Sequence, residues 1–139
     1  MSLAAVGADS IRPQVFAWPL GVWALMAVLA VSNGILREAV FVARLGAYRA
    51  HVLSTLLLVA VILAVAALFF ARTAVQYTQA ELRLVGLGWA LLTVGFEFLV
   101  GFATGEPVAT TLAQYDVVAG KIWVLVPIAL FLAPLGFGR

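Results

Sequence analysis

Apolar residues fill most of the chain in four long runs, and each run ends at charged residues or at residues typical of turns. Each run approaches the roughly 20 residues that a helix needs to cross the hydrocarbon core of a bilayer. The sequence therefore predicts an all-α polytopic membrane protein with one short mobile N-terminal tail (1–14) and one transmembrane domain (15–139). The four transmembrane helices are expected over residues 15–41, 51–72, 82–104 and 116–137.

Short connections join the four apolar segments. Gly46, Gly105 and the polar run of residues 72–81 supply the breaks between them. Short loops make successive helices antiparallel, so we expect an up-down-up-down four-helix bundle. Pro127 and Pro134 lie inside the fourth segment and are expected to kink it or to end it early.

Composition supports the same class. Hydrophobic residues make up 65% of the chain and charged residues 10%, whereas soluble proteins carry about 25% charged residues. A net charge of +2 with scattered basic residues does not indicate nucleic-acid binding. The chain has no cysteine, which excludes disulfides, thiolate zinc sites and iron–sulfur clusters, and its one histidine, His51, excludes bis-histidine haem ligation within one chain.

The basic residues nearly balance across the membrane. Four of them fall on the side of the two termini and four on the other side, and the excess of Lys and Arg in cytoplasmic loops sets topology. We expect both termini in the cytoplasm, on the premise that the four basic residues on the other side are partly held inside the bundle. The two sets are Arg12, Arg72, Arg83 and Arg139, and Arg37, Arg44, Arg49 and Lys121.

Glu97 lies inside a stretch, residues 84–105, that is otherwise free of formal charge. A carboxylate at that depth costs about 2.5–3.5 kcal/mol on insertion scales, so it is expected to be partnered or protonated. Helical spacing puts Thr93, Glu97 and Gly101 on one interior face. Two interpretations stay open: a structural ion pair or hydrogen bond that locks helix packing, or a group that handles protons, ions or a substrate.

Antiparallel connection brings one end of every segment to the same membrane face, and ionisable residues crowd that end. At 1.5 Å per residue Glu97 lies about 10 Å inside its helix end, within reach of Arg37, His51 or Lys121. The residues at the opposite end, Arg12 and Glu81 among them, are interpreted as ordinary flanking charges. The predicted polar intramembrane cluster comprises Asn33, Arg37, Glu38, His51, Ser54, Glu97, Tyr115, Asp116 and Lys121.

Each member of this cluster also has a simpler interpretation: charged helix ends, polar contacts between helices, helix caps or a lysine that reaches the headgroups. Glu38, His51 and Glu97 are weak candidate metal ligands, since no ExxH spacing exists and each would come from a different helix. Neither a GxSxG motif nor a serine with an adjacent histidine is present. No catalytic residue and no cofactor is predicted.

Four sequence blocks resemble recurring blocks of small prokaryotic four-helix integral membrane proteins of uncharacterised function. The resemblance spans most of residues 33–123 and implies a multi-pass protein of a prokaryotic cytoplasmic membrane, with the same polar residues at issue. It brings no activity with it. The blocks are NGILRE (33–38), LGAYRAHVLS (45–54), GFEFLVG (95–101) and QYDVVAGKIW (114–123).

Three classes of function remain. The first is passage of protons, ions or small polar solutes, with the chain acting as a homo-oligomer in the lipid bilayer. The second is an accessory or assembly subunit of a larger membrane complex. The third, ranked behind the others, is a membrane enzyme or cofactor binder.

Overall fold

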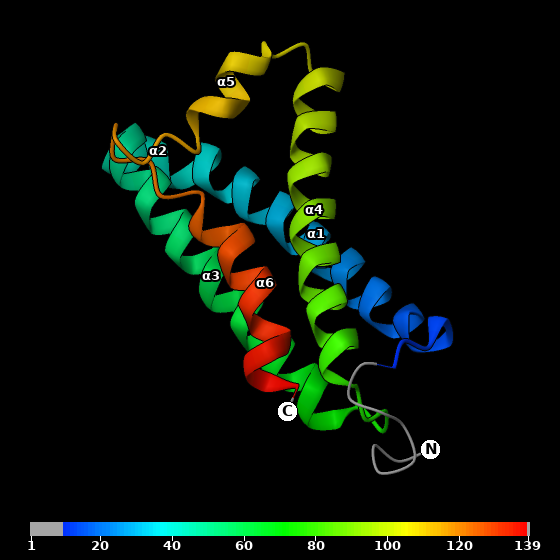
Figure 1. Ribbon diagram of the computed structural model, residues 1–139. Coiled ribbons are helices and arrows are strands. Elements are labelled where there is room, and N and C mark those ends of the chain that lie inside the picture. Colours follow the sequence, from blue (N-terminus) through cyan, green and yellow to red (C-terminus); the bar gives the residue numbers. More distant parts are fainter. Residues whose placement is uncertain (1–9, 139) are drawn as a thin grey trace.

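The computed structural model describes residues 10–138, which contain helices and no strand (Figure 1). Three helical stretches among these residues are long and apolar enough to cross a membrane: Pro13–Leu45, α3 and α4. This confirms an all-helical chain of the membrane type. The elements in order are η2 (Pro13–Phe16), α1 (Ala17–Leu36), η3 (Arg37–Phe41), α2 (Val42–Leu45), α3 (Ala47–Arg72), α4 (Gln79–Ala103), α5 (Val108–Ala113) and α6 (Leu125–Phe137).

The first helical stretch is longer than expected. It runs without a break through the π-helical turn η3 and through α2, for 33 residues. At 1.5 Å per residue that is about 50 Å, against a hydrocarbon core of about 30 Å. The stretch ends at Gly46, whose φ of 82° lies in the left-handed region that glycine adopts freely, and α3 begins at the next residue. Arg37 and Glu38 therefore lie on a continuous helix.

The fourth segment differs most from expectation. Instead of one helix over 116–137, the structure has the short α5, a run of turns, and α6 of 13 residues, which spans about 20 Å. Gly120 has φ 86°, and the carbonyl of Asp116 accepts hydrogen bonds from the backbone N–H groups of Ala119 and Lys121, so turns replace the first half of the predicted helix. The described residues thus hold three helical stretches of spanning length, and the fourth segment forms the short α5 and α6 instead of one spanning helix.

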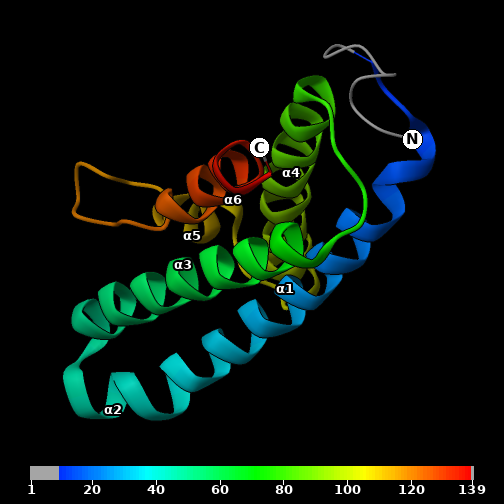
Figure 2. The ribbon, with the colours of Figure 1, turned by 90° about the horizontal axis from the view of Figure 1, so that it is seen from below.

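The prolines of α6 do not end it. Pro127 falls in the first turn, where a missing N–H costs no intrahelical bond, and Pro134 lies within the last turns while the helix continues to Phe137. α6 packs between α3 and α4, as Figure 2 shows from below, and α1 packs against α3. Toward the end that carries α5, α4 leans away from α3 (Figure 1).

The main core contains side chains from α1, α3, α4 and α6. Residues four apart on α3 face inward, and Trp89 of α4 packs against them while its indole N–H donates to the carbonyl of Pro19 at 2.9 Å. That bond ties the middle of α4 to the start of α1. The buried residues of this core include Met26, Leu58, Ile62, Ala66, Val85, Trp89, Trp123, Val126, Leu130 and Ala133.

The opposite end of the bundle corrects one interpretation. Glu81, expected as a flanking charge, is fully buried, and its carboxylate accepts hydrogen bonds from the Arg12 side chain at 2.7 and 2.9 Å. Thr78 and Glu81 also form a reciprocal capping box that begins α4. The Thr78 hydroxyl donates to the carbonyl of Ser10 at 2.6 Å, so residues 10–12 of the expected tail are attached to α4; residues 1–9 lie outside the described residues.

Arg12→Ala should clearly destabilise the protein, because it leaves the buried Glu81 carboxylate without its cation. Denaturant or thermal unfolding in detergent measures the loss. The matched control is Arg83→Ala, which removes an exposed arginine from α4, the helix that carries Glu81, and should change stability little. Equal effects of the two substitutions would contradict the assignment.

Gly86→Ala should destabilise the bundle by about 1–3 kcal/mol, since an added Cβ would collide with the backbone carbonyl of Phe131 in α6. Gly95→Ala on the same helix is the control, because within residues 10–138 no atom beyond its own helical surroundings lies within 4 Å of a Cβ built there. Unfolding of both variants in detergent checks the difference. If Gly86→Ala were as stable as Gly95→Ala, the close approach of α4 and α6 would be refuted.

Candidate functional site

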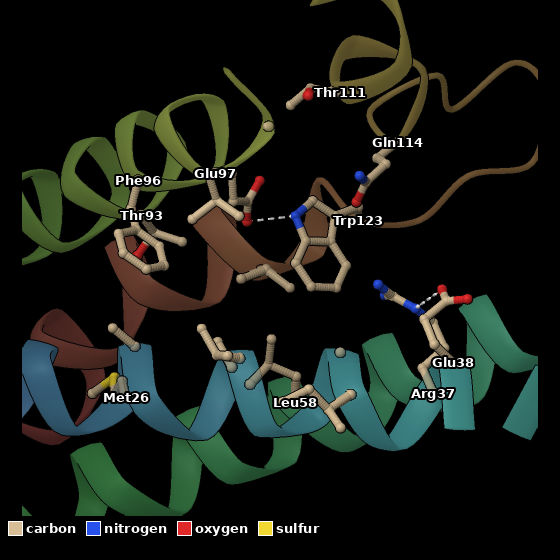
Figure 3. A pocket seen from close by; sticks show the side chains of 18 of the residues that line it. Met26, Arg37, Glu38, Leu58, Thr93, Phe96, Glu97, Thr111, Gln114 and Trp123 are labelled. Carbon is tan, nitrogen blue, oxygen red and sulfur yellow. Dashed lines mark hydrogen bonds and ion pairs between the residues drawn. The ribbon is translucent and has the colours of Figure 1, made fainter. Parts of the chain in front are cut away.

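A cavity of about 890 Å³ lies between α1, α4 and α6, on the side where α5 closes the end of the bundle. Its inner part is apolar and includes Met26, Leu58 and Leu130, and its outer part carries charged and polar side chains (Figure 3). Val31 and Ile35 of α1 line it and are also exposed, so the cavity opens partly toward the side of the bundle.

Glu97 projects from α4 into this cavity. The indole N–H of Trp123 donates to Glu97 Oε1 at 2.6 Å, and the hydroxyl of Tyr115 donates to Oε2. Among residues 10–138 no basic group lies within ion-pair distance of this carboxylate. The interior orientation matches expectation, whereas a partner from Arg37, His51 or Lys121 does not.

The two donors reach Glu97 because the fourth segment is not helical there. Tyr115 follows α5 and Trp123 precedes α6, so both belong to the run of turns between these helices. Burial, and secondarily the hydrogen bond with Glu97, raises the pKa of Tyr115, which keeps its hydroxyl protonated as a donor. Hydrogen bonds to an ionised acceptor are stronger than neutral ones.

Arg37 and Glu38 stand at the outer part of the cavity (Figure 3). The Nε atom of Arg37 lies 3.3 Å from Glu38 Oε1, and its guanidinium carbon lies 5.9 Å from the centre of the Trp123 ring. That distance is within the range of cation–π attraction. The arginine thus contacts the indole that holds Glu97, while its charge is compensated by a neighbour on its own helix.

Side chains in the first turns of α3 hydrogen-bond the turns that precede α6. The Nε2 atom of His51 accepts a hydrogen bond from the backbone N–H of Ile122 at 3.0 Å, so its lone pair is in use. The hydroxyl of Ser54 is buried and donates to the carbonyl of His51. Tyr48 adds a hydrogen bond from its hydroxyl to the carbonyl of Gly120 at 3.1 Å. The first turns of α3 therefore hold the segment that carries Trp123.

The remaining predicted cluster members lie apart from the cavity. Asn33 is buried beside a smaller cavity of about 190 Å³ between α1 and α3, and within the described residues its Oδ1 has no hydrogen-bond partner. Asp116 is exposed, and its carboxylate accepts the backbone N–H of Ala119. Lys121 is half-buried in the same turns. The structure brings together Arg37, Glu38, Glu97 and Tyr115.

The metal candidates Glu38, His51 and Glu97 do not come together as a ligand set. Within residues 10–138 no group of three His, Asp or Glu side chains is placed to hold an ion. The predicted cluster also omitted Thr111, Gln114 and Trp123, which line the cavity. Trp123 carries one signal in the sequence, a position two residues after Lys121 in the same polar block.

No family model, curated protein or solved structure matches this chain. The class of the protein therefore comes from its own features: residues 10–138 form an all-helical structure with three apolar helices of membrane-spanning length and a carboxylate that lines a cavity.

Trp123→Phe should lower stability by about 0.5–3 kcal/mol, because it removes the hydrogen bond to the Glu97 carboxyl group while the aromatic ring is kept. Thermal unfolding in detergent measures the effect, with the exposed Trp18→Phe as control. In a Glu97→Gln background the cost of Trp123→Phe should shrink. Identical costs in the two backgrounds would show that the two side chains are not coupled.

Proposed function

We propose that the protein binds a small solute in this cavity as a step in its passage across the membrane, and that Glu97 is the group that receives it. One observation carries the proposal: a carboxylate within an apolar bundle faces a cavity and is held by two neutral donors instead of a cation. An ionised group at such a depth is costly, and neutral hydrogen bonds offset only part of that cost. A proton, a cation or a solute that donates hydrogen bonds would supply the rest.

The shape of the cavity supports access from one side at a time. Its inner part ends on Leu58, Ile62 and Leu130, and beyond these residues the packed core continues to the Arg12–Glu81 ion pair. Passage then requires a second arrangement in which α6 or α4 moves and the inner end opens.

Membrane placement is part of the proposal. α6 completes the transmembrane bundle as a shortened fourth element in an up-down-up-down order, and both termini face the cytoplasm of a prokaryotic cell. Arg37 and Lys121 are partly buried, which supports the premise for this orientation; Arg44 and Arg49 are exposed.

We further propose that the chain acts as a homo-oligomer. Gly88 and Gly95 lie seven residues apart on α4, where within residues 10–138 nothing contacts a Cβ built at either position. Small residues on an outer helix face allow close approach of another helix. Native mass of the detergent-purified protein separates a homo-oligomer from the alternative, a subunit that brings down larger partners in fixed ratio.

Glu97→Gln should reduce proton flux in reconstituted vesicles to the level of protein-free vesicles, measured with a trapped pH-sensitive dye under an imposed membrane potential. Glu106→Gln, at the outer part of the same cavity, is the control and should keep most of the flux. Flux that is unchanged in Glu97→Gln would remove Glu97 from the mechanism.

Thr93→Cys should react with a water-borne maleimide in intact membranes, because Thr93 lines the cavity. Leu91→Cys, two residues away on the exposed face of α4, should resist the reagent because acyl chains surround it. The natural chain has no cysteine, so each variant carries a single thiol. Equal labelling of both positions would contradict a solvent-accessible cavity.

A further inference from the structure

We infer that the solute of this cavity is an amphipathic organic cation, whose ammonium-type head lies at Glu97 and whose apolar body lies along the inner wall. The inference rests on the proposed function, since it names the ligand class of the same site. Three features carry it: the charge of the lining, its aromatic surfaces and its opening.

The charge of the lining is negative. Among the described residues that line the cavity there are three carboxylates, Glu38, Glu97 and Glu106, and one guanidinium, that of Arg37. Arg37 pairs with Glu38, and among residues 10–138 no basic group lies within ion-pair distance of Glu97, on which the charge of Arg37 acts only from farther away. Like charge excludes anions from such a site, and a cationic head completes it.

Aromatic rings stand beside this carboxylate. Trp123 donates to it. Phe96 and Trp23 also line the cavity, with their ring centres 6.0 Å apart in an edge-to-face arrangement, and the Trp23 indole N–H donates to the hydroxyl of Thr93, one turn from Glu97. The face of an indole or phenyl ring attracts a cation, and the guanidinium over Trp123 uses this attraction within the protein itself. An organic ammonium or phosphonium group fits such surroundings better than a strongly hydrated metal ion does.

The opening favours an apolar body over a fully polar one. Val31, Ile35 and Val100 line the cavity and are exposed on the membrane-spanning helices α1 and α4, so the opening reaches the surface that acyl chains would cover. A volume of about 890 Å³ is within the range of about 300–1,000 Å³ that holds drug-sized ligands. A ligand that partitions into the bilayer can enter along this side.

The test compares two hydrophobic ions of the same shape and opposite charge, tetraphenylphosphonium and tetraphenylborate. Purified protein in lipid nanodiscs is titrated with each ion, binding is followed by tryptophan fluorescence, and empty nanodiscs correct for partition into lipid. The expected result is saturable binding of the phosphonium, with an affinity for the borate that is lower by about tenfold or more.

Two variants locate the binding. Glu97→Gln should weaken phosphonium binding about tenfold or more, and Ala30→Phe, which keeps the carboxylate but fills the cavity wall, should abolish it. The exposed substitution Leu91→Phe is the control for the second variant. Should Glu97→Gln fail to fold, Ala30→Phe and the borate comparison still decide the question.

Three outcomes would overturn the inference: equal binding of the two ions, phosphonium binding that neither variant alters, or a phospholipid that co-purifies in fixed ratio and is lost in Ala30→Phe. Each leaves the proposed function standing if Glu97-dependent proton flux and labelling of Thr93→Cys persist. If Glu97-dependent flux and the labelling of Thr93→Cys are also absent, both the inference and the proposed function are wrong.

Discussion

The hydrogen bonds from Tyr115 and Trp123 to the Glu97 carboxylate are the interaction on which the rest of this end of the bundle depends. They join α4 to the turns that replace the first half of the fourth segment, and His51 and Tyr48 hold the same turns from α3. In the proposed membrane placement these turns are irregular backbone at membrane depth, which is tolerated only where protein or a water-filled cavity surrounds it. Glu97 therefore anchors the non-helical segment and, in the proposed mechanism, also receives the solute.

The long helices and the orientation of Glu97 could be predicted from the pattern of apolar residues. Three helices of spanning length and the inward orientation of Glu97 follow from runs of apolar residues and from a spacing of three and four on α4. The partners of Glu97 could not follow from it, because Tyr115 and Trp123 lie on turns that have no helical phase. The break itself depends on Gly120 in the left-handed region and on turns around Asp116.

The ion pair of Arg12 and Glu81 was missed for a different reason. Its members are 69 positions apart, and nothing local distinguishes Arg12 from the exposed Arg72 and Arg83. Only the packing of the chain before α1 against the start of α4 brings them together. The buried Glu81 carboxylate is paired with a guanidinium, whereas among residues 10–138 the partly buried Glu97 has no basic group within ion-pair distance. In the proposed mechanism the first acid closes one end of the bundle and the second binds the solute.

The unequal lengths of the helices have a consequence for the surrounding lipid. The first helical stretch exceeds the thickness of a bilayer core, whereas α6, in the proposed membrane placement and with Ile128 and Leu132 exposed along its outer side, covers about two thirds of it. A membrane responds to such mismatch by local thinning beside the short helix and by tilt of the long one. Thicker, more ordered bilayers would therefore press on α6 more than on any other element, so lipid composition acts on the same helix that borders the cavity.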